Sequence, residues 1–334
     1  MNPSPARQST IATERRVYSA AKVYARENRV QSWFHLWVVV LCVGCSYSII
    51  LHSTHVLLSF IMSLLLSLLL VRFFVIYHDY VHKTILQNSI IATVIFTFFG
   101  LYILAPISIW NRTHNHHHQH NSKLNGSGIG SYPIITKKEY LDSSPSERFF
   151  YLVTRHPFTI LAGYFTTFLY GMCLRSVVNN FRKHYDSLLA LGLHTGIGLI
   201  LFLAGGIGPF IFSFLLPALI SSCLGSYLFY VQHNYPGVAH RQNENWSYYN
   251  AAMASSAYIK MNPLMEWFTA NIGYHHIHHL NAAIPFYKLP KAYNAIPELK
   301  IEKDTSLHPF DIWKCLKLKV WDPATNKMIG VNNL

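Results

Sequence analysis

The stretch FHLWVVVLCVGCSYSIILHSTHVLLSFIMSLLLSLLLVRFFVIY (residues 34–77) decides the fold, and HDYVH (78–82) follows it at once. About 20 apolar residues span the hydrocarbon core of a bilayer. The stretch therefore predicts two membrane helices, near 34–51 and 56–77, joined by a turn at 52–55. Arg72 is its only lysine or arginine, and the side chain either snorkels to the interface or faces protein.

Three histidine clusters lie beside or between such apolar stretches. Residues three or four apart share one face of a helix, so each cluster predicts a set of imidazoles on one side. Eight such rings exceed the three or four protein ligands of one tetrahedral zinc, and two metals explain them better. The candidate ligands are His78 and His82 in HDYVH, His114, His117 and His118 in HNHHH, and His275, His278 and His279 in HHIHH.

Spacing leaves the ligand register and the metal open. His116 with His120, and His276 with His279, also satisfy helical spacing. Imidazole suits iron, copper, zinc and nickel alike. A single HxxxH arises easily in a chain with 20 histidines, and histidine-rich runs can be weak metal binders. Recurrence of the spacing in three clusters is what favours one shared centre.

A shared centre constrains the topology. A second apolar block, near 187–231, predicts another helical hairpin that turns at Gly205–Pro209. If either of two further apolar stretches, 89–109 or 158–174, crossed the membrane alone, the three clusters would not all lie on one side. We therefore expect both stretches to be interfacial or re-entrant, which leaves four membrane crossings.

Charge indicates the orientation. The turns at 52–55 and 205–209 contain no lysine or arginine, whereas basic residues gather before the first hairpin and between the hairpins. By the positive-inside rule, both termini and all three clusters face the cytoplasm. The net charge of +13 also suits contact with anionic lipids or an acidic protein partner. Nucleic acid is not expected as a partner, because topology accounts for the basic residues.

We expect a single domain over residues 1–334, in five segments. They are an N-terminal interfacial segment (1–33), the first hairpin (34–77), a cytosolic and interfacial segment (78–186), the second hairpin (187–231) and a cytosolic cap (232–334). The five cysteines predict no disulfide framework, and His194 is expected to be a packing residue within its helix.

Several classes of site are absent. Only 14 acidic residues are present, without the Glu-x-x-His pairs of soluble di-iron bundles. No phosphate loop, dinucleotide fingerprint or nucleophile elbow stands beside a suitable element. A metal site rich in histidine and poor in carboxylate is the remaining prediction.

The order HDYVH, WNRTHNHHH, NIGYHHIHHLN and IPFYKLP resembles the three histidine boxes of the integral-membrane fatty acid desaturases. The resemblance extends from about residue 34 to WDPATNKM near the C-terminus, and is strongest to bacterial acyl-lipid desaturases of the omega-6 or delta-12 type. It implies four membrane helices in an all-α fold with a cytosolic helical cap, a di-iron centre, and a ninth ligand, His233 in YVQHNYP.

The resemblance also implies the reaction, which is the oxygen-dependent insertion of a cis double bond into an acyl chain at two non-haem irons. Asp79 and Glu266 are candidate hydrogen-bond acceptors for the free N–H groups of the ligands. The HPGG signature of a fused cytochrome is absent, so we expect a separate electron donor, either ferredoxin or a b-type cytochrome with its reductase. The expected location is a bacterial inner membrane.

Two other functions share these features. A membrane hydroxylase or ketolase would use the same histidine chemistry on an acyl or other lipid substrate. A metal transporter or sensor would need no reaction, but it would place ionisable residues inside its spanning helices. Here the main clusters lie at predicted helix ends, which favours an enzyme.

Overall fold

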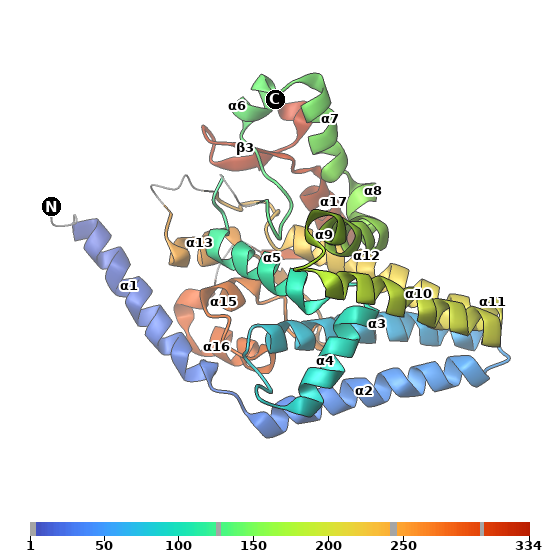
Figure 1. The fold of residues 1–334 in the computed structure, drawn as a ribbon. Helices are drawn as coiled ribbons and strands as arrows, with labels where there is room; N and C mark the ends of the chain where they lie inside the picture. The colour runs from blue at the N-terminus through green and yellow to red at the C-terminus, as the bar shows by residue number, and fades with distance from the viewer. Residues whose placement is uncertain (1–4, 125–127, 241–245, 301–303) are drawn as a thin grey trace.

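A computed structural model describes residues 5–124, 128–240, 246–300 and 304–334. Within these ranges, four helical spans are long and apolar enough to cross a membrane. In Figure 1 they run roughly parallel, with both connecting turns at one end and most of the remaining chain at the other. Within the described residues the chain is mostly helical, with two small two-stranded sheets added. The predicted helical membrane fold is confirmed, and the strands are an addition to it.

The first hairpin consists of α2 (Arg29–His52) and α3 (Val56–Val81), both long and apolar enough to cross a membrane. Asn28 begins α2, because its side chain accepts a hydrogen bond from the Gln31 amide. The predicted helices 34–51 and 56–77 are both present. Each is extended at the end away from the turn.

The second hairpin consists of α10 (Tyr185–Gly205) and a span over Ile207–Val231. This span is built from α11 (Ile207–Phe210), the π-helical η3 (Ile211–Leu215) and α12 (Leu216–Val231). Gly206 makes the turn with a φ of +79°, which a residue with a side chain rarely adopts. The turn falls where the sequence predicts it.

The apolar stretch 89–109 is broken in two. Helices α4 (Ile90–Tyr102) and α5 (Ile107–His120) meet at an angle of 87°. His194 of α10 lies beside the end of α4, with its Nδ1 2.6 Å from the Tyr102 carbonyl oxygen and its Nε2 2.8 Å from the Tyr164 hydroxyl. A bend of this size is found in a broken span or in a re-entrant segment, and His194 packs as predicted.

The stretch 158–174 is also broken, into α8 (Pro157–Leu161) and the π-helical η2 (Tyr164–Leu174). A Cβ on Gly163, at the join, would lie 2.6 Å from the Ser222 carbonyl oxygen. Glycine therefore allows this segment to approach α12 closely. Neither piece has the length of a membrane span.

Short elements form the cap at the end of the bundle opposite the turns (Figure 1). Capping boxes begin two of its helices. In one the Glu139 side chain accepts a hydrogen bond from the Thr136 amide, and in the other the Glu147 side chain accepts one from the Ser144 amide. The cap helices are α6 (Lys137–Asp142), α7 (Pro145–Thr154), α9 (Arg175–Asn180), α13 (Tyr248–Ser255), α14 (Pro263–Phe268), α15 (His275–Leu280), α16 (Leu289–Ala295) and α17 (Pro309–Lys317), with single 3₁₀ turns at Val23–Ala25, Phe286–Lys288, Pro297–Leu299 and Val331–Asn333.

Two small sheets join segments of the C-terminal region to one another. β1 (Tyr258–Lys260) pairs in parallel with β2 (Asp304–Ser306), and β3 (Val320–Asp322) pairs antiparallel with β4 (Lys327–Ile329). Each strand has three residues, too few for an alternating pattern to be recognised in the sequence.

Arg72 of α3 faces protein and is 2% exposed. Its guanidinium donates to the Trp267 carbonyl oxygen of α14 and lies 4.1 Å from the centre of the Trp267 ring. It also lies 3.1 Å from Nδ1 of His35 in α2. The arginine thus joins the first hairpin to the cap just before the third histidine cluster.

The N-terminal segment is helical over α1 (Pro5–Lys22), but its contacts are with the cap. Arg16 pairs with Glu298, and the Ser247 hydroxyl donates to Glu14 at 3.3 Å. Val17 and Ala21 are buried. These contacts place the helix against the cap, and the membrane-surface position expected for residues 1–33 stays a prediction. All five cysteines are free, as expected.

Candidate metal centre

The end of α3 supplies the first two histidines. His78 lies in the last turn of the helix, and His82 is the residue after it. Their rings are neighbours, with centroids 4.5 Å apart. The long apolar helix therefore delivers the HxxxH pair at the point where the chain leaves the bundle.

Helix α5 supplies the second set, His114, His117 and His118, all buried. Trp110 stacks on the His114 ring at 4.6 Å and 12°. The start of the helix is fixed by Asp186 of α10, which accepts hydrogen bonds from the Ser108 amide at 3.0 Å and the Ser108 hydroxyl at 2.6 Å. The bend after α4 thus places this set against the end of α3.

Helix α15 supplies His275, His278 and His279, and all six of its residues are buried. His233 follows the end of α12, where Nδ1 bonds to the Ser255 carbonyl oxygen at 2.9 Å. The structure therefore brings all nine predicted ligands into the same region.

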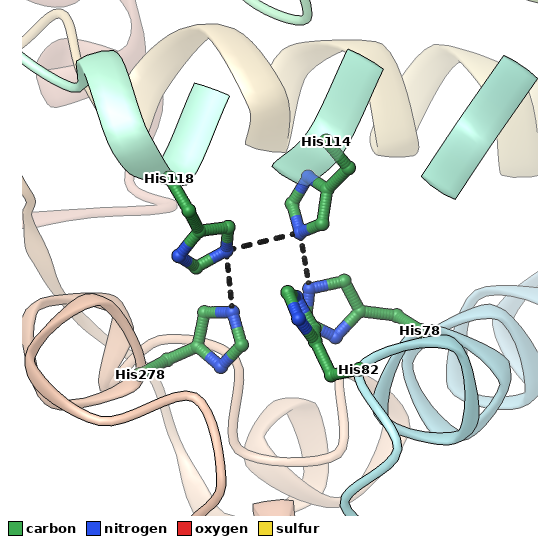
Figure 2. A group of neighbouring side chains, drawn as sticks. All are labelled: His78, His82, His114, His118 and His278. Carbon is green, nitrogen blue, oxygen red and sulfur yellow. Dashed lines mark hydrogen bonds between the residues drawn. The ribbon is translucent and has the colours of Figure 1, made fainter. Parts of the chain in front are cut away.

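The nine histidines form two groups, each with nitrogen atoms within 4.8 Å of one another. The first group is His78, His82, His114, His118 and His278, and the second is His117, His233, His275 and His279. Figure 2 shows the rings of the first group pointing toward one another from three separate segments.

Helix geometry explains the division. Residues four apart lie on one face, whereas adjacent residues point about 100° apart. Each pair at that spacing accordingly enters one group: His78 with His82, His114 with His118, and His275 with His279. The remaining member of each triplet, His117 or His278, lies on a different face and enters the other group.

Both groups fit a metal ion. Nitrogens bound at about 2.0–2.1 Å lie about 2.9 Å apart in an octahedron and about 3.3 Å apart in a tetrahedron. The separations between neighbouring Nε2 atoms run from 2.8 Å, for His78 and His114, to 3.3 Å, for His117 and His279. The buried Nε2 of His82 has no hydrogen-bond partner among the described residues. Such a convergence of ring nitrogens is a metal-binding arrangement.

The protonation of the rings suits metal binding as well. Burial lowers the pKa of His233 and of His82 to about 4. Burial, reinforced by His233, also lowers the pKa of His275 well below its ordinary value. The rings are therefore neutral at physiological pH, and His233 presents the Nε2 lone pair because its Nδ1 proton is held by Ser255.

A cavity of about 1020 Å³ adjoins both groups. His78 and His114 of the first group line it, as do His117, His233 and His275 of the second. The lining continues over apolar side chains of α3, η2 and α12, namely Leu70, Phe74, Phe168, Met172, Leu228 and Phe229. An apolar chain in this cavity would pass beside both histidine groups.

Comparison with known proteins agrees with the site. A family model described as fatty acid desaturase matches residues 52–310. The chain belongs to the fatty acid desaturase family. Members of this family are oxidoreductases.

Named desaturases are similar over most of this chain. A fatty acid desaturase of Bacillus subtilis (strain 168) is 29% identical over 318 residues, covering 89% of this chain and 82% of its own length. An sn-1 oleoyl-lipid 12-desaturase of Anabaena variabilis is 24% identical over 279 residues (82% and 78%), and one from a Synechocystis strain is 25% identical over 228 residues (67% and 64%). The predicted resemblance to the bacterial omega-6 type is confirmed.

The alternative histidines lie outside the two groups of this desaturase. His116 and His120 stack on each other, with ring centroids 3.9 Å apart. His276 is buried, with its Nε2 2.9 Å from the Leu299 carbonyl oxygen. Helical spacing alone does not separate these three from the nine.

The two candidate acceptors differ in their contacts. Asp79 Oδ1 lies 3.2 Å from Nδ1 of His78, and Oδ2 accepts from the Phe286 amide at 2.7 Å. Glu266 instead accepts from the Tyr274 hydroxyl at 3.2 Å and bonds to no histidine among the described residues. Asp79 is therefore placed to hold the orientation of the His78 ring. Glu266 contacts Tyr274, the residue before His275, and not a histidine of either group.

The different contacts of Asp79 and Glu266 predict different effects on metal binding when each carboxylate is replaced by an amide. Asp79→Asn keeps an oxygen for the Phe286 amide but can place an amide N–H group against Nδ1 of His78. Loss of an acceptor behind a ligating histidine typically weakens metal binding about 10–100-fold. We expect Asp79→Asn to lower metal retention in competition with a chelator by that factor, and Glu266→Gln to leave it unchanged. Equal retention by both variants would remove Asp79 from the site.

Sequence reasoning missed the residues that shape the cavity and fix α5. Phe74, Phe168 and Phe229 come from three separate elements, and nothing in their spacing brings them together. Ser108 and Asp186 are far apart in the chain and carry no motif. Trp110 stands four residues before His114, but its place in the cavity wall depends on the bend after α4.

Proposed function

We propose that this desaturase inserts a cis double bond into an acyl chain of a membrane lipid, using molecular oxygen and two irons held by the nine histidines. The observation that carries the proposal is that one cavity is lined both by members of the two histidine groups and by apolar side chains. A metal transporter or sensor, the non-catalytic alternative, would need no apolar cavity of this kind. A chain of methylene groups, which offers no polar handle, needs one.

The irons would supply the oxygen-activating redox chemistry that unactivated C–H bonds require. The protein holds nine neutral imidazoles around them and positions the acyl chain. Phe74 and Phe229 pack against Trp110, with ring centroids 5.0 and 5.5 Å away, and Trp110 stacks on His114. This aromatic wall would keep two adjacent methylenes beside the ligands and exclude water.

The stoichiometry of the reaction requires a source of electrons in addition to the metal site. Conversion of –CH2–CH2– to –CH=CH– with reduction of O2 to two waters consumes two further electrons and two protons. The electrons would come from ferredoxin or a b-type cytochrome with its reductase. The donor would dock on the side of the protein where the lysines and arginines before and between the hairpins gather. The metal site and both termini would then face the cytoplasm of a bacterial inner membrane.

The similar proteins favour an acyl lipid as the substrate. Relatives in Anabaena and Synechocystis are named sn-1 oleoyl-lipid 12-desaturases. An oleoyl group esterified to a membrane lipid also suits a cavity that opens beside membrane spans.

The test is expression in a bacterial host that makes no polyunsaturated fatty acids, together with a competent electron donor. Mass spectrometry of the host lipids should detect a new double bond in oleoyl chains. A hydroxylated chain would instead show a hydroxylase, and unchanged lipids would contradict both functions. A variant lacking the His117 ligand, made at the same level, controls for endogenous activity.

A further inference from the structure

The cavity has a polar end that the apolar chain does not need. Arg112 of α5 and Arg175 of α9 line it, together with Asn179, Asn180 and His184. Helix α10 packs against both α5 and α9, so these residues gather where three elements meet. His184 directly precedes Tyr185, the first residue of the third span, so this end lies where that span begins.

Both arginines carry a charge that is not matched by protein. Their side chains are exposed, and neither forms an ion pair within the described part of the chain. Asp186, the carboxylate of this region, accepts from Ser108 with both of its oxygens. The guanidinium forks are free to bind an anion, and their planar geometry matches the oxygens of a phosphate.

The surroundings of Arg175 are those of a membrane surface. In the same segment Val178 is 84% exposed and Phe181 is 52% exposed. Large apolar side chains beside arginine and lysine, just before a span, are typical of a helix at the lipid interface. Phospholipid phosphates lie at this depth, with acyl chains directed into the apolar layer.

We propose that Arg112 and Arg175 bind the phosphate of a phospholipid whose acyl chain occupies the cavity. The desaturase then selects phospholipids over uncharged glycolipids. This inference rests on the proposed function, because it assigns the carrier of the same acyl chain. Asn179 and His184 lie within the same wall and complete a polar collar around the headgroup.

Binding can be measured without turnover. Native mass spectrometry of the iron-loaded desaturase in detergent would titrate dioleoyl phosphatidylglycerol, a dioleoyl galactolipid and oleoyl-coenzyme A. We expect the phospholipid to bind more tightly than the galactolipid. Arg112→Gln and Arg175→Gln should each weaken phospholipid binding about three- to tenfold, the effect of losing one exposed charge-assisted contact, and should leave the galactolipid unchanged.

Two further variants sharpen the test. Arg175→Lys keeps the charge without the fork and should recover part of the affinity. Arg182→Gln, in the same segment but outside the cavity lining, should have no effect. Equal binding of phospholipid and galactolipid, an effect of Arg182→Gln as large as that of Arg175→Gln, or loss of coenzyme A binding alone would overturn the proposal. Selective phospholipid binding without any new double bond would overturn the proposed function while leaving this inference intact.

Discussion

Replacing His117 with alanine is expected to abolish desaturation and remove iron from the second histidine group. His117 Nε2 lies 2.9 Å from that of His233 and 3.3 Å from that of His279, so its loss leaves the group with three ligands. Loss of an acceptor behind a ligand already weakens metal binding about 10–100-fold, and loss of the ligand itself should exceed this. The measurements are product formation in the expression host and iron content of the purified protein.

His116 provides the matched control. It precedes His117 on the same helix and stacks on His120, outside both groups. His116→Ala should retain iron and activity, as should His52→Ala at the membrane turn. If His116→Ala lost iron while His117→Ala kept it, the assignment of ligands on α5 would be wrong.

Filling the cavity should abolish turnover of long acyl chains without removing metal. Gly225 of α12 lines the cavity, and a Cβ there would meet only Phe168, at 3.7 Å. The larger side chain of Gly225→Leu would occupy space that the methylenes need. We expect product from oleoyl chains to fall at least tenfold, the equivalent of about 1.4 kcal/mol in the barrier, with iron content unchanged.

Gly192→Leu makes the same change elsewhere. Gly192 lies on α10, with nothing within 4 Å of an added Cβ, and it does not line the cavity. This variant should desaturate normally. Equal activity of the two variants would show that the acyl chain binds somewhere else.

The sequence predicts much of this fold because a membrane imposes a length on apolar stretches. The hairpins at 34–77 and 187–231 need no tertiary information. Requiring one shared metal centre predicts in addition that 89–109 and 158–174 are interfacial or re-entrant. The contacts of α1 with Glu298 and Ser247 were not predictable, because they depend on how the cap folds back. The three-residue strands carry no periodic signal at all.

The metal site, like the fold, could be predicted from the sequence only in part. Helical spacing identifies eight histidines, and His233 came only through the family resemblance, since a single histidine after a helix has no pattern. Spacing did not separate His117 from His116, which are adjacent on α5. The bend of 87° after α4 decides which of them faces the centre. The polar end of the cavity likewise depends on α5, α9 and α10 meeting.

We propose that one chain of this desaturase holds two irons in two all-histidine groups. The most direct measurement is iron content with Mössbauer spectroscopy of the desaturase purified after growth on ⁵⁷Fe, free of adventitious metal. We expect two irons per chain with nitrogen-rich ligation. An active desaturase that contains one iron per chain, or none, would contradict it.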